Sequence, residues 1–198
     1  MANTNRVNGF RPVKHINGAP YNGQANLYYI PAGEATAVMV GDFVKLSDSD
    51  SLDGVPAVER LAASGSVTSG VIVGTVVGFP VAPASGLDTP QYRAASTARY
   101  CYVADSPDLV FASQEDGVGG AIAAASVGLN VGLDASAGST VTGASGMQID
   151  SSTAATTNTL PLRLYSIVQK EDNEVGSAYA RWLVTINTHQ YANGSTGV

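Results

Sequence analysis

The last long apolar stretch of the chain, residues 160–191, constrains the fold more than any other segment. Every second residue in each of its two halves is apolar: Leu160, Leu162 and Leu164, then Trp182, Val184 and Ile186. Such a period of two is typical of half-buried β-strands. A charged connection, residues 169–177, separates the halves, so the stretch predicts a long antiparallel hairpin. A hairpin is not stable alone, and the rest of the chain must therefore supply more strands and a core.

Further short apolar segments, each bounded by turn residues, recur along the chain. They are residues 27–30, 37–46, 70–81, 99–104 and 109–113. The segment 70–81 is rich in β-branched residues, which favours a strand buried on both faces. No segment shows the periodicity of an amphipathic helix of three turns. The pattern predicts an all-β fold, a sandwich or a jelly-roll-like barrel of short antiparallel strands with long loops.

The domain organisation follows from the placement of these segments. A length of 198 residues suits one domain. We predict an extended N-terminal arm over residues 1–26, a single β-rich domain over 27–192 and a frayed tail over 193–198. Residues 117–159 are mostly Gly, Ala, Ser and Thr and are predicted to be an insertion in the domain. Aliphatic residues recur within this insertion, which favours ordered β-structure or a rigid loop over a disordered linker.

Charge is scarce and unevenly distributed. Charged residues make up 13% of the chain, against about 25% in ordinary globular domains, so we expect partners to cover much of the surface. The net charge of −6 argues against nucleic acid as a partner. Arg6, Arg11 and Lys14 precede the first acidic residue, Glu34. A basic arm on an acidic body predicts docking on an acidic protein surface, and the alternative is a solvated tail.

The sequence contains no recognisable active site, and we expect neither an enzyme nor a cofactor or metal. The two histidines, His15 and His189, are far apart and lack neighbours at zinc-ligand spacing. Residues 48–59 have acids at three positions of a calcium loop, but Leu52 and Asp53 break the pattern, which favours a solvated acidic turn. The glycines in 117–120 lack the surrounding βαβ unit of a dinucleotide loop.

Two further observations concern the compartment. The single cysteine, Cys101, lies between Tyr100 and Tyr102 and is predicted to be a small core residue rather than a nucleophile. The longest mostly apolar run, residues 71–84, is short for a bilayer span and is interrupted by glycine and proline. The N-terminus shows no apolar signal region. We therefore expect synthesis in a cytoplasm and no membrane partner.

Three segments carry a resemblance to small structural proteins of tailed bacteriophages, which act as capsid cement or decoration proteins. The first is the opening, MANTNRVNGFRPVKHINGAPYNGQANLYYIP, and the second is SQEDGVGGAIAAASVGLNVGL. The third is SGMQIDSSTAATTNTLPLRLYSIVQKEDNEVGSAYARWLVTINTH. Together these segments cover about half of the chain, 97 of its 198 residues. The resemblance implies a β-rich structural protein of the virion, which binds the outer capsid surface by contacting the major capsid protein, often as a homotrimer.

On this reading the arm is a clamp on the capsid or on a neighbouring copy. We predict contacts from these residues: Phe10, Arg11, Pro12, Lys14, His15, Tyr21, Tyr28 and Tyr29. Deletion of residues 1–26 is then expected to abolish shell binding and leave the β body folded. The alternative function is a glycan-binding head-fibre or adhesin-like module, because tyrosines on strands also suit sugar binding.

Overall fold

The computed structural model describes residues 3–48, 54–81 and 86–192. Within these ranges the chain forms fourteen β-strands and two short 3₁₀ helices, and no α-helix. The strands are β1 Arg11–His15, β2 Asn26–Ile30, β3 Val38–Met39, β4 Phe43–Leu46, β5 Val58–Arg60, β6 Ser66–Val67, β7 Gly74–Gly78, β8 Tyr92–Arg93, β9 Arg99–Ala104, β10 Leu109–Gln114, β11 Asn130–Asp134, β12 Gln148–Ala155, β13 Leu162–Ile167 and β14 Arg181–Ile186. The helices are η1 Gly86–Asp88 and η2 Ala124–Ser126.

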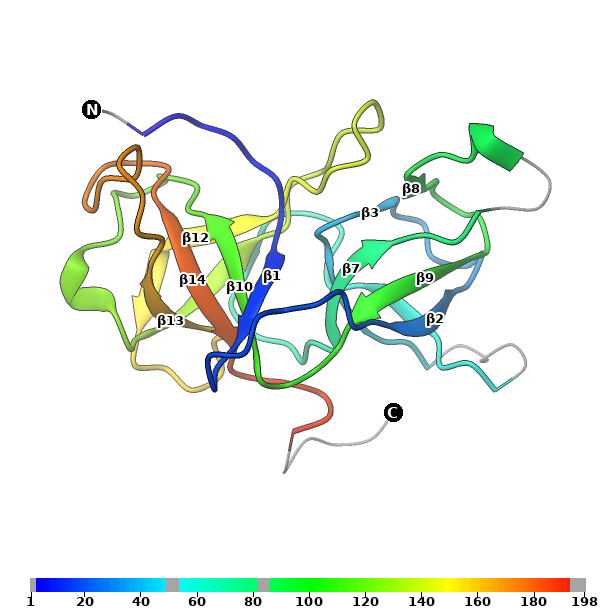
Figure 1. Ribbon diagram of the computed structural model, residues 1–198, viewed down its shortest axis with the longest axis horizontal. Helices are drawn as coiled ribbons and strands as arrows, with labels where there is room; N and C mark the ends of the chain where they lie inside the picture. The colour runs from blue at the N-terminus through cyan, green and yellow to red at the C-terminus, as the bar shows by residue number, and fades with distance from the viewer. Residues whose placement is uncertain (1–2, 49–53, 82–85, 193–198) are drawn as a thin grey trace.

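The strands form antiparallel sheets, as the sequence predicts. A seven-stranded sheet has the order β1-β10-β14-β13-β11-β12, with β6 added beside β11. A five-stranded sheet has the order β2-β9-β7-β4-β5, and β3 pairs with β8 in a small third sheet. The two large sheets lie side by side (Figure 1). Neither is closed into a barrel, so of the two predicted architectures the sandwich is the consistent one.

The C-terminal hairpin is present as predicted. Strands β13 and β14 pair antiparallel, with Leu164 opposite Val184. The inward side chains include Trp182, which is fully buried. The Gly/Ala/Ser/Thr-rich region is also ordered: it supplies β11 and β12, which pair with each other. These strands are integral parts of the seven-stranded sheet, so the predicted insertion belongs to the core of the fold.

Three phenylalanines join the two large sheets. Phe10 stacks on Phe43 of β4 with ring centroids 4.3 Å apart. The edge of the Phe43 ring meets Phe111 of β10 at 5.3 Å. All three are fully buried and belong to the larger hydrophobic core. A smaller core, which includes Val44, lies within the five-stranded sheet.

Part of the predicted extended arm, residues 1–26, packs within the body of the chain. Strand β1 pairs with β10 and forms one edge of the seven-stranded sheet. The preceding Phe10 is anchored through its backbone, because its N–H donates to Gly41 at 2.9 Å and its carbonyl accepts from Thr75 at 3.0 Å. Turn dipeptides and basic residues suggested an arm, but the pairing of β1 with β10 and the burial of Phe10 make residues 10–15 part of the body.

Cys101 lies in the smaller core, where its thiol is shielded from solvent. Its side chain is fully buried, and burial raises the pKa of the thiol to about 12, with nearby Arg99 only partly opposing the shift. Because the thiolate is the reactive form, we expect native protein at about pH 8 to resist iodoacetamide. Protein unfolded in urea should be alkylated fully, as measured by intact mass. Rapid labelling of the native protein would contradict this packing.

Candidate binding surfaces at the junction of the two sheets

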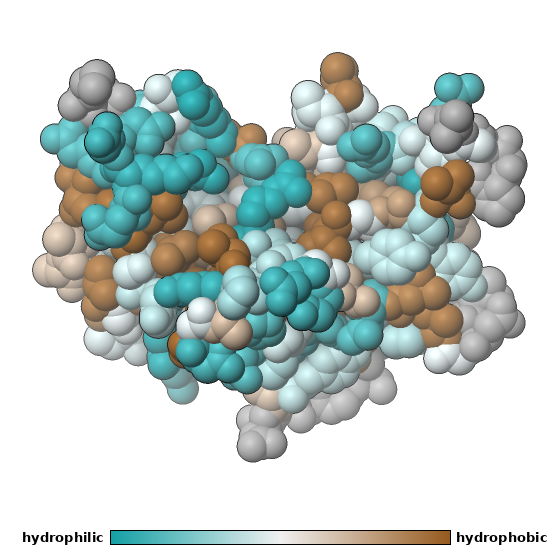
Figure 2. Space-filling model, in the orientation of Figure 1, coloured by the Kyte–Doolittle hydropathy of each residue, from teal (hydrophilic) through white to brown (hydrophobic). Residues whose placement is uncertain are grey.

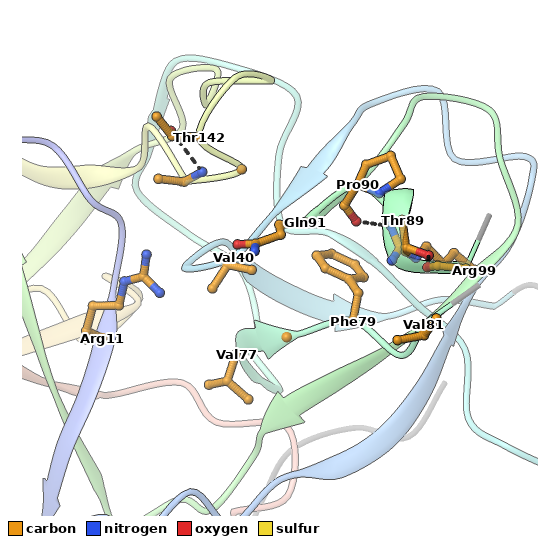
Figure 3. Close-up of a pocket in the computed structure, with 14 residues that line it drawn as sticks. Arg11, Val40, Val77, Phe79, Val81, Thr89, Pro90, Gln91, Arg99 and Thr142 are labelled. Carbon is orange, nitrogen blue, oxygen red and sulfur yellow. Dashed lines mark hydrogen bonds between the residues drawn. The ribbon is translucent and has the colours of Figure 1, made fainter. Parts of the chain in front are cut away.

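A groove of about 430 Å³ lies where the two large sheets meet. Figure 3 shows it between β1 on one side and the loops around β7 and β9 on the other. Figure 2 shows apolar residues exposed in the hollow between the two halves of this face. Its lining comprises Arg11, Val40, Val77, Gly78, Phe79, Val81, Gly86, Thr89, Pro90, Gln91, Arg99, Thr142, Gly143 and Ala144.

Arg11 of β1 forms one end of the groove. Its guanidinium is held by Asn8, since Nε donates to the Asn8 carbonyl at 3.0 Å and Nη2 donates to Asn8 Oδ1 at 2.6 Å. Among the described residues, Nη1 has no partner. Partial burial lowers the pKa of Arg11 from its ordinary value, and the group remains cationic at neutral pH.

Arg99 of β9 forms the opposite end. Its Nη1 donates to the carbonyls of Pro90 and Tyr92 at 2.8 and 2.6 Å, and Nη2 donates to Pro80 at 3.2 Å. The guanidinium lies 4.7 Å from the centre of the Phe79 ring. Its Nε is buried and has no hydrogen-bond partner. These contacts fix a cation beside the Phe79 ring, and burial lowers its pKa.

Between residues 138 and 146 a loop contributes a wall of the groove and stands out from the body near the junction of the sheets (Figure 1). It is tied to the strand region around β3, because the Val40 N–H donates to the Gly143 carbonyl at 3.0 Å. Gly143 has φ +69°, and a Cβ there would lie 2.7 Å from the Gln91 carbonyl oxygen. The loop therefore needs glycine at this position to pack against Gln91.

An aromatic face covers the outer side of β2 and β9. Leu27 lies opposite Tyr102, and Tyr29 lies opposite Tyr100, so all four share one face of the sheet. Leu27 and Tyr102 are 40% and 41% exposed, and the rings of Tyr29 and Tyr100 are 5.4 Å apart. We call Leu27, Tyr29, Tyr100 and Tyr102 the aromatic face.

The aromatic face continues into the groove at Gly78. This residue of β7 is registered opposite Tyr102 and also lines the groove. A Cβ built on Gly78 would meet nothing within 4 Å. Gly78 therefore links the aromatic face, through its register with Tyr102, to the lining of the groove.

A second pocket of about 410 Å³ lies between the sheets and is lined by His15, Tyr21 and Asp105, among others. The Asp105 carboxylate accepts from the Tyr28 hydroxyl at 2.6 Å and from Asn26 at 2.9 Å. Burial is the largest cause that raises the pKa of Tyr28, followed by its hydrogen bond to Asp105. The carboxylate is thus already committed to neighbours within the chain.

A third depression gathers Asp116, Asp134 and Asp150 with several serines. Serine hydroxyls donate to these carboxylates, for example Ser152 to Asp150 at 2.6 Å. The described residues contain no group of three or more His, Cys, Asp or Glu that could hold a metal ion. Of the weak calcium-loop pattern, positions 49–53 lie outside the described residues. Acidic side chains thus gather apart from the groove.

The eight residues predicted as contacts do not form one site. Phe10 and Tyr28 are buried, so they belong to the core and not to a surface that a partner can reach. Arg11 lines the groove, and Tyr29 lies on the aromatic face. The remaining four lie on or after β1: Pro12 is half-buried, Lys14 lies over the ring of Tyr165, and His15 and Tyr21 line the second pocket.

The groove itself was not visible in the sequence, because its residues come from six separated segments. Arg99 is the first residue of a strand with two tyrosines, and Gly78 interrupts an apolar run. Either feature is ordinary alone. Only the register of β7 beside β9 brings them to one surface.

No helix in the described part of the chain is long and apolar enough to cross a membrane. A scan against protein-family models, a search of curated proteins and a search of solved structures each gave no match to this chain.

Proposed function

We propose that the chain is a structural protein of a phage head, which binds the outside of the capsid and stabilises it by bridging major capsid protein subunits. The observation that carries this proposal is the aromatic face and its continuation into the groove. The resemblance of three long segments to phage cement proteins supplies the identity of the partner. In this proposal the chain acts as a homotrimer on the shell.

The aromatic face has the properties of a protein-binding surface. Tyrosine is enriched at the centres of protein interfaces, because its ring buries much area and loses little conformational entropy. Here the rings stand on paired strands, and the Tyr29 and Tyr100 rings contact each other. A rigid platform of this kind lowers the entropic cost of binding.

Stabilisation of the shell then follows from mass action. A ligand that binds the assembled shell and not its dissociated subunits favours the assembled state. A chain that contacts more than one subunit, or acts as a trimer, adds avidity to each contact. No catalytic step is needed for this role.

Substitution of Tyr102 by aspartate tests the proposal. Tyr102→Asp should weaken binding to empty heads of the encoding phage at least about tenfold, because a charge would replace the exposed ring at the proposed interface and would be buried there on binding. Co-sedimentation across a range of chain concentrations measures this. Tyr165→Asp is the matched control, since Tyr165 is 38% exposed on β13 of the other sheet. Binding of Tyr102→Asp equal to wild type would rule out the aromatic face as the contact.

The aromatic face also favours a second candidate function, a glycan-binding module. Tyr102 is exposed, and the Tyr29 and Tyr100 planes are inclined at 56° to each other, which leaves ring surface for a sugar. A glycan array distinguishes the two functions. Saturable binding of one glycan class that is lost in Tyr102→Asp, without binding to heads, would favour the glycan-binding module.

A further inference from the structure

The two arginines of the groove are cations without an acidic partner. Among the described residues the ion pairs are Lys45 with Glu59 and Arg60 with Asp42, so neither Arg11 nor Arg99 is in one. Both are partly desolvated, and burial lowers the pKa of each. Arg11 Nη1 donates to no described residue, and Arg99 Nη2 donates to a single carbonyl, so each guanidinium keeps a donor for a ligand. Desolvated, unpaired cations favour an anionic ligand.

The charge of the groove contrasts with that of the whole chain. The net charge is −6, yet none of the described residues that line the groove is acidic. The two arginines lie at opposite ends of the groove in Figure 3. An acidic group between them would be attracted from both sides, and the partly apolar surroundings would strengthen that attraction.

The walls of the groove combine apolar and polar groups. Val77, Phe79 and Pro90 contribute apolar side chains, and Thr142 and Gln91 contribute polar groups. Such mixed walls suit a peptide, which carries both apolar side chains and polar backbone groups. The volume of about 430 Å³ accommodates a few residues.

From these observations we propose that the groove binds an extended segment of a protein partner in which an acidic side chain, flanked by apolar residues, lies between Arg11 and Arg99. This inference rests on the proposed function, because it identifies the chemistry by which the capsid protein would be recognised. The aromatic face, continuous with the groove through Gly78, would contact the residues that flank this segment.

Gly78 offers a way to fill the groove without disturbing the fold. Its φ lies outside the left-handed region, and a Cβ there meets nothing within 4 Å. Gly78→Glu should therefore fold normally while placing a negative charge against the acidic segment. Gly33 has the same two properties and lies in an exposed connection after β2. Gly33→Glu is thus a matched control for the added charge.

Arg11 offers the complementary change. Arg11→Glu reverses the charge at one end of the groove, whereas Arg11→Lys keeps the charge but loses the planar guanidinium. Circular dichroism and urea unfolding of each variant establish that the body is folded. Binding to empty heads of the encoding phage is then measured by co-sedimentation at low and high salt.

We expect Gly78→Glu and Arg11→Glu each to weaken head binding at least about tenfold, with Gly33→Glu unchanged and Arg11→Lys intermediate. High salt should weaken wild-type binding more than that of Arg11→Glu. If wild type binds heads and both groove variants bind equally well, the groove proposal fails and the proposed function stands. If wild type does not bind heads, the proposed function fails first. A loss of self-association in both groove variants, with head binding unchanged, would make a second copy of this chain the occupant and overturn the proposal.

Discussion

Asp42→Ala should lower the free energy of unfolding by about 3–5 kcal/mol, because it leaves a buried arginine without its counter-charge. Arg60 Nε donates to Asp42 Oδ2 at 2.9 Å, and the two side chains are 2% and 0% exposed. The same carboxylate accepts from Ser145 at 2.5 Å and from the Met39 N–H at 2.9 Å. A typical domain has only about 5–15 kcal/mol of stability, so this loss is a large fraction.

The Arg60 side chain explains why the effect should reach beyond one strand pair. Its Nη1 donates to the carbonyls of Ala62 and Ala135 at 2.7 and 3.1 Å, and Nη2 donates to Ser136 at 2.8 Å. The pair therefore ties β4 and β5 of one sheet to the segment that follows β11 of the other.

The exposed pair Lys45–Glu59 is the natural control for Asp42→Ala. It joins the same two strands, with Lys45 opposite Glu59, and the charged groups are 2.8 Å apart but well exposed. Glu59→Gln should cost no more than about 1 kcal/mol. Urea unfolding of both variants measures the difference. Equal effects of Asp42→Ala and Glu59→Gln would contradict the role given to burial.

Phe10→Ala should destabilise the chain by about 3–5 kcal/mol, the usual cost of removing a large aromatic side chain from a packed core. Phe10 has no exposed surface and stacks on Phe43 at the junction of the two sheets. Loss of the ring would leave a cavity beside Phe43, which the anchored backbone around residue 10 cannot close.

Val13→Ala is the control for Phe10→Ala, because Val13 lies on β1 and is 45% exposed. It should cost less than about 1 kcal/mol. If Phe10→Ala were as mild as Val13→Ala in urea unfolding, the N-terminal segment would be an arm separate from the core.

The packing of Phe10 also means that deletion of residues 1–26 removes core as well as surface. Point variants in the groove therefore test binding more cleanly than that deletion.

The sequence predicts where the strands lie better than it predicts which strands pair with each other. Alternating apolar residues locate the hairpin of β13 and β14, and β-branched residues locate β7, because these are local signals. Whether residues 99–104 and 109–114 pair is not a local property. They are consecutive strands, yet β9 lies in the five-stranded sheet and β10 in the seven-stranded sheet.

The candidate binding surfaces were harder to predict than the fold, because they too depend on which strands pair. Arg11 and Tyr29 were predicted as contact residues from composition and position, and the structure places them on exposed features. Phe10 and Tyr28 have the same sequence character but face inward. The difference depends on which side of a strand faces the core, and that is set by sheet pairing.

In the proposed function the chain stabilises an assembled phage head, and the most direct test is the rupture temperature of empty, expanded heads that lack the chain. Purified chain is added at increasing concentration, the number of bound copies is measured by sedimentation, and rupture is followed by light scattering. We predict saturation at a fixed number of copies per head and a rupture temperature that rises with occupancy. Heads that remain free of the chain, or that rupture at an unchanged temperature when saturated with it, would contradict the account.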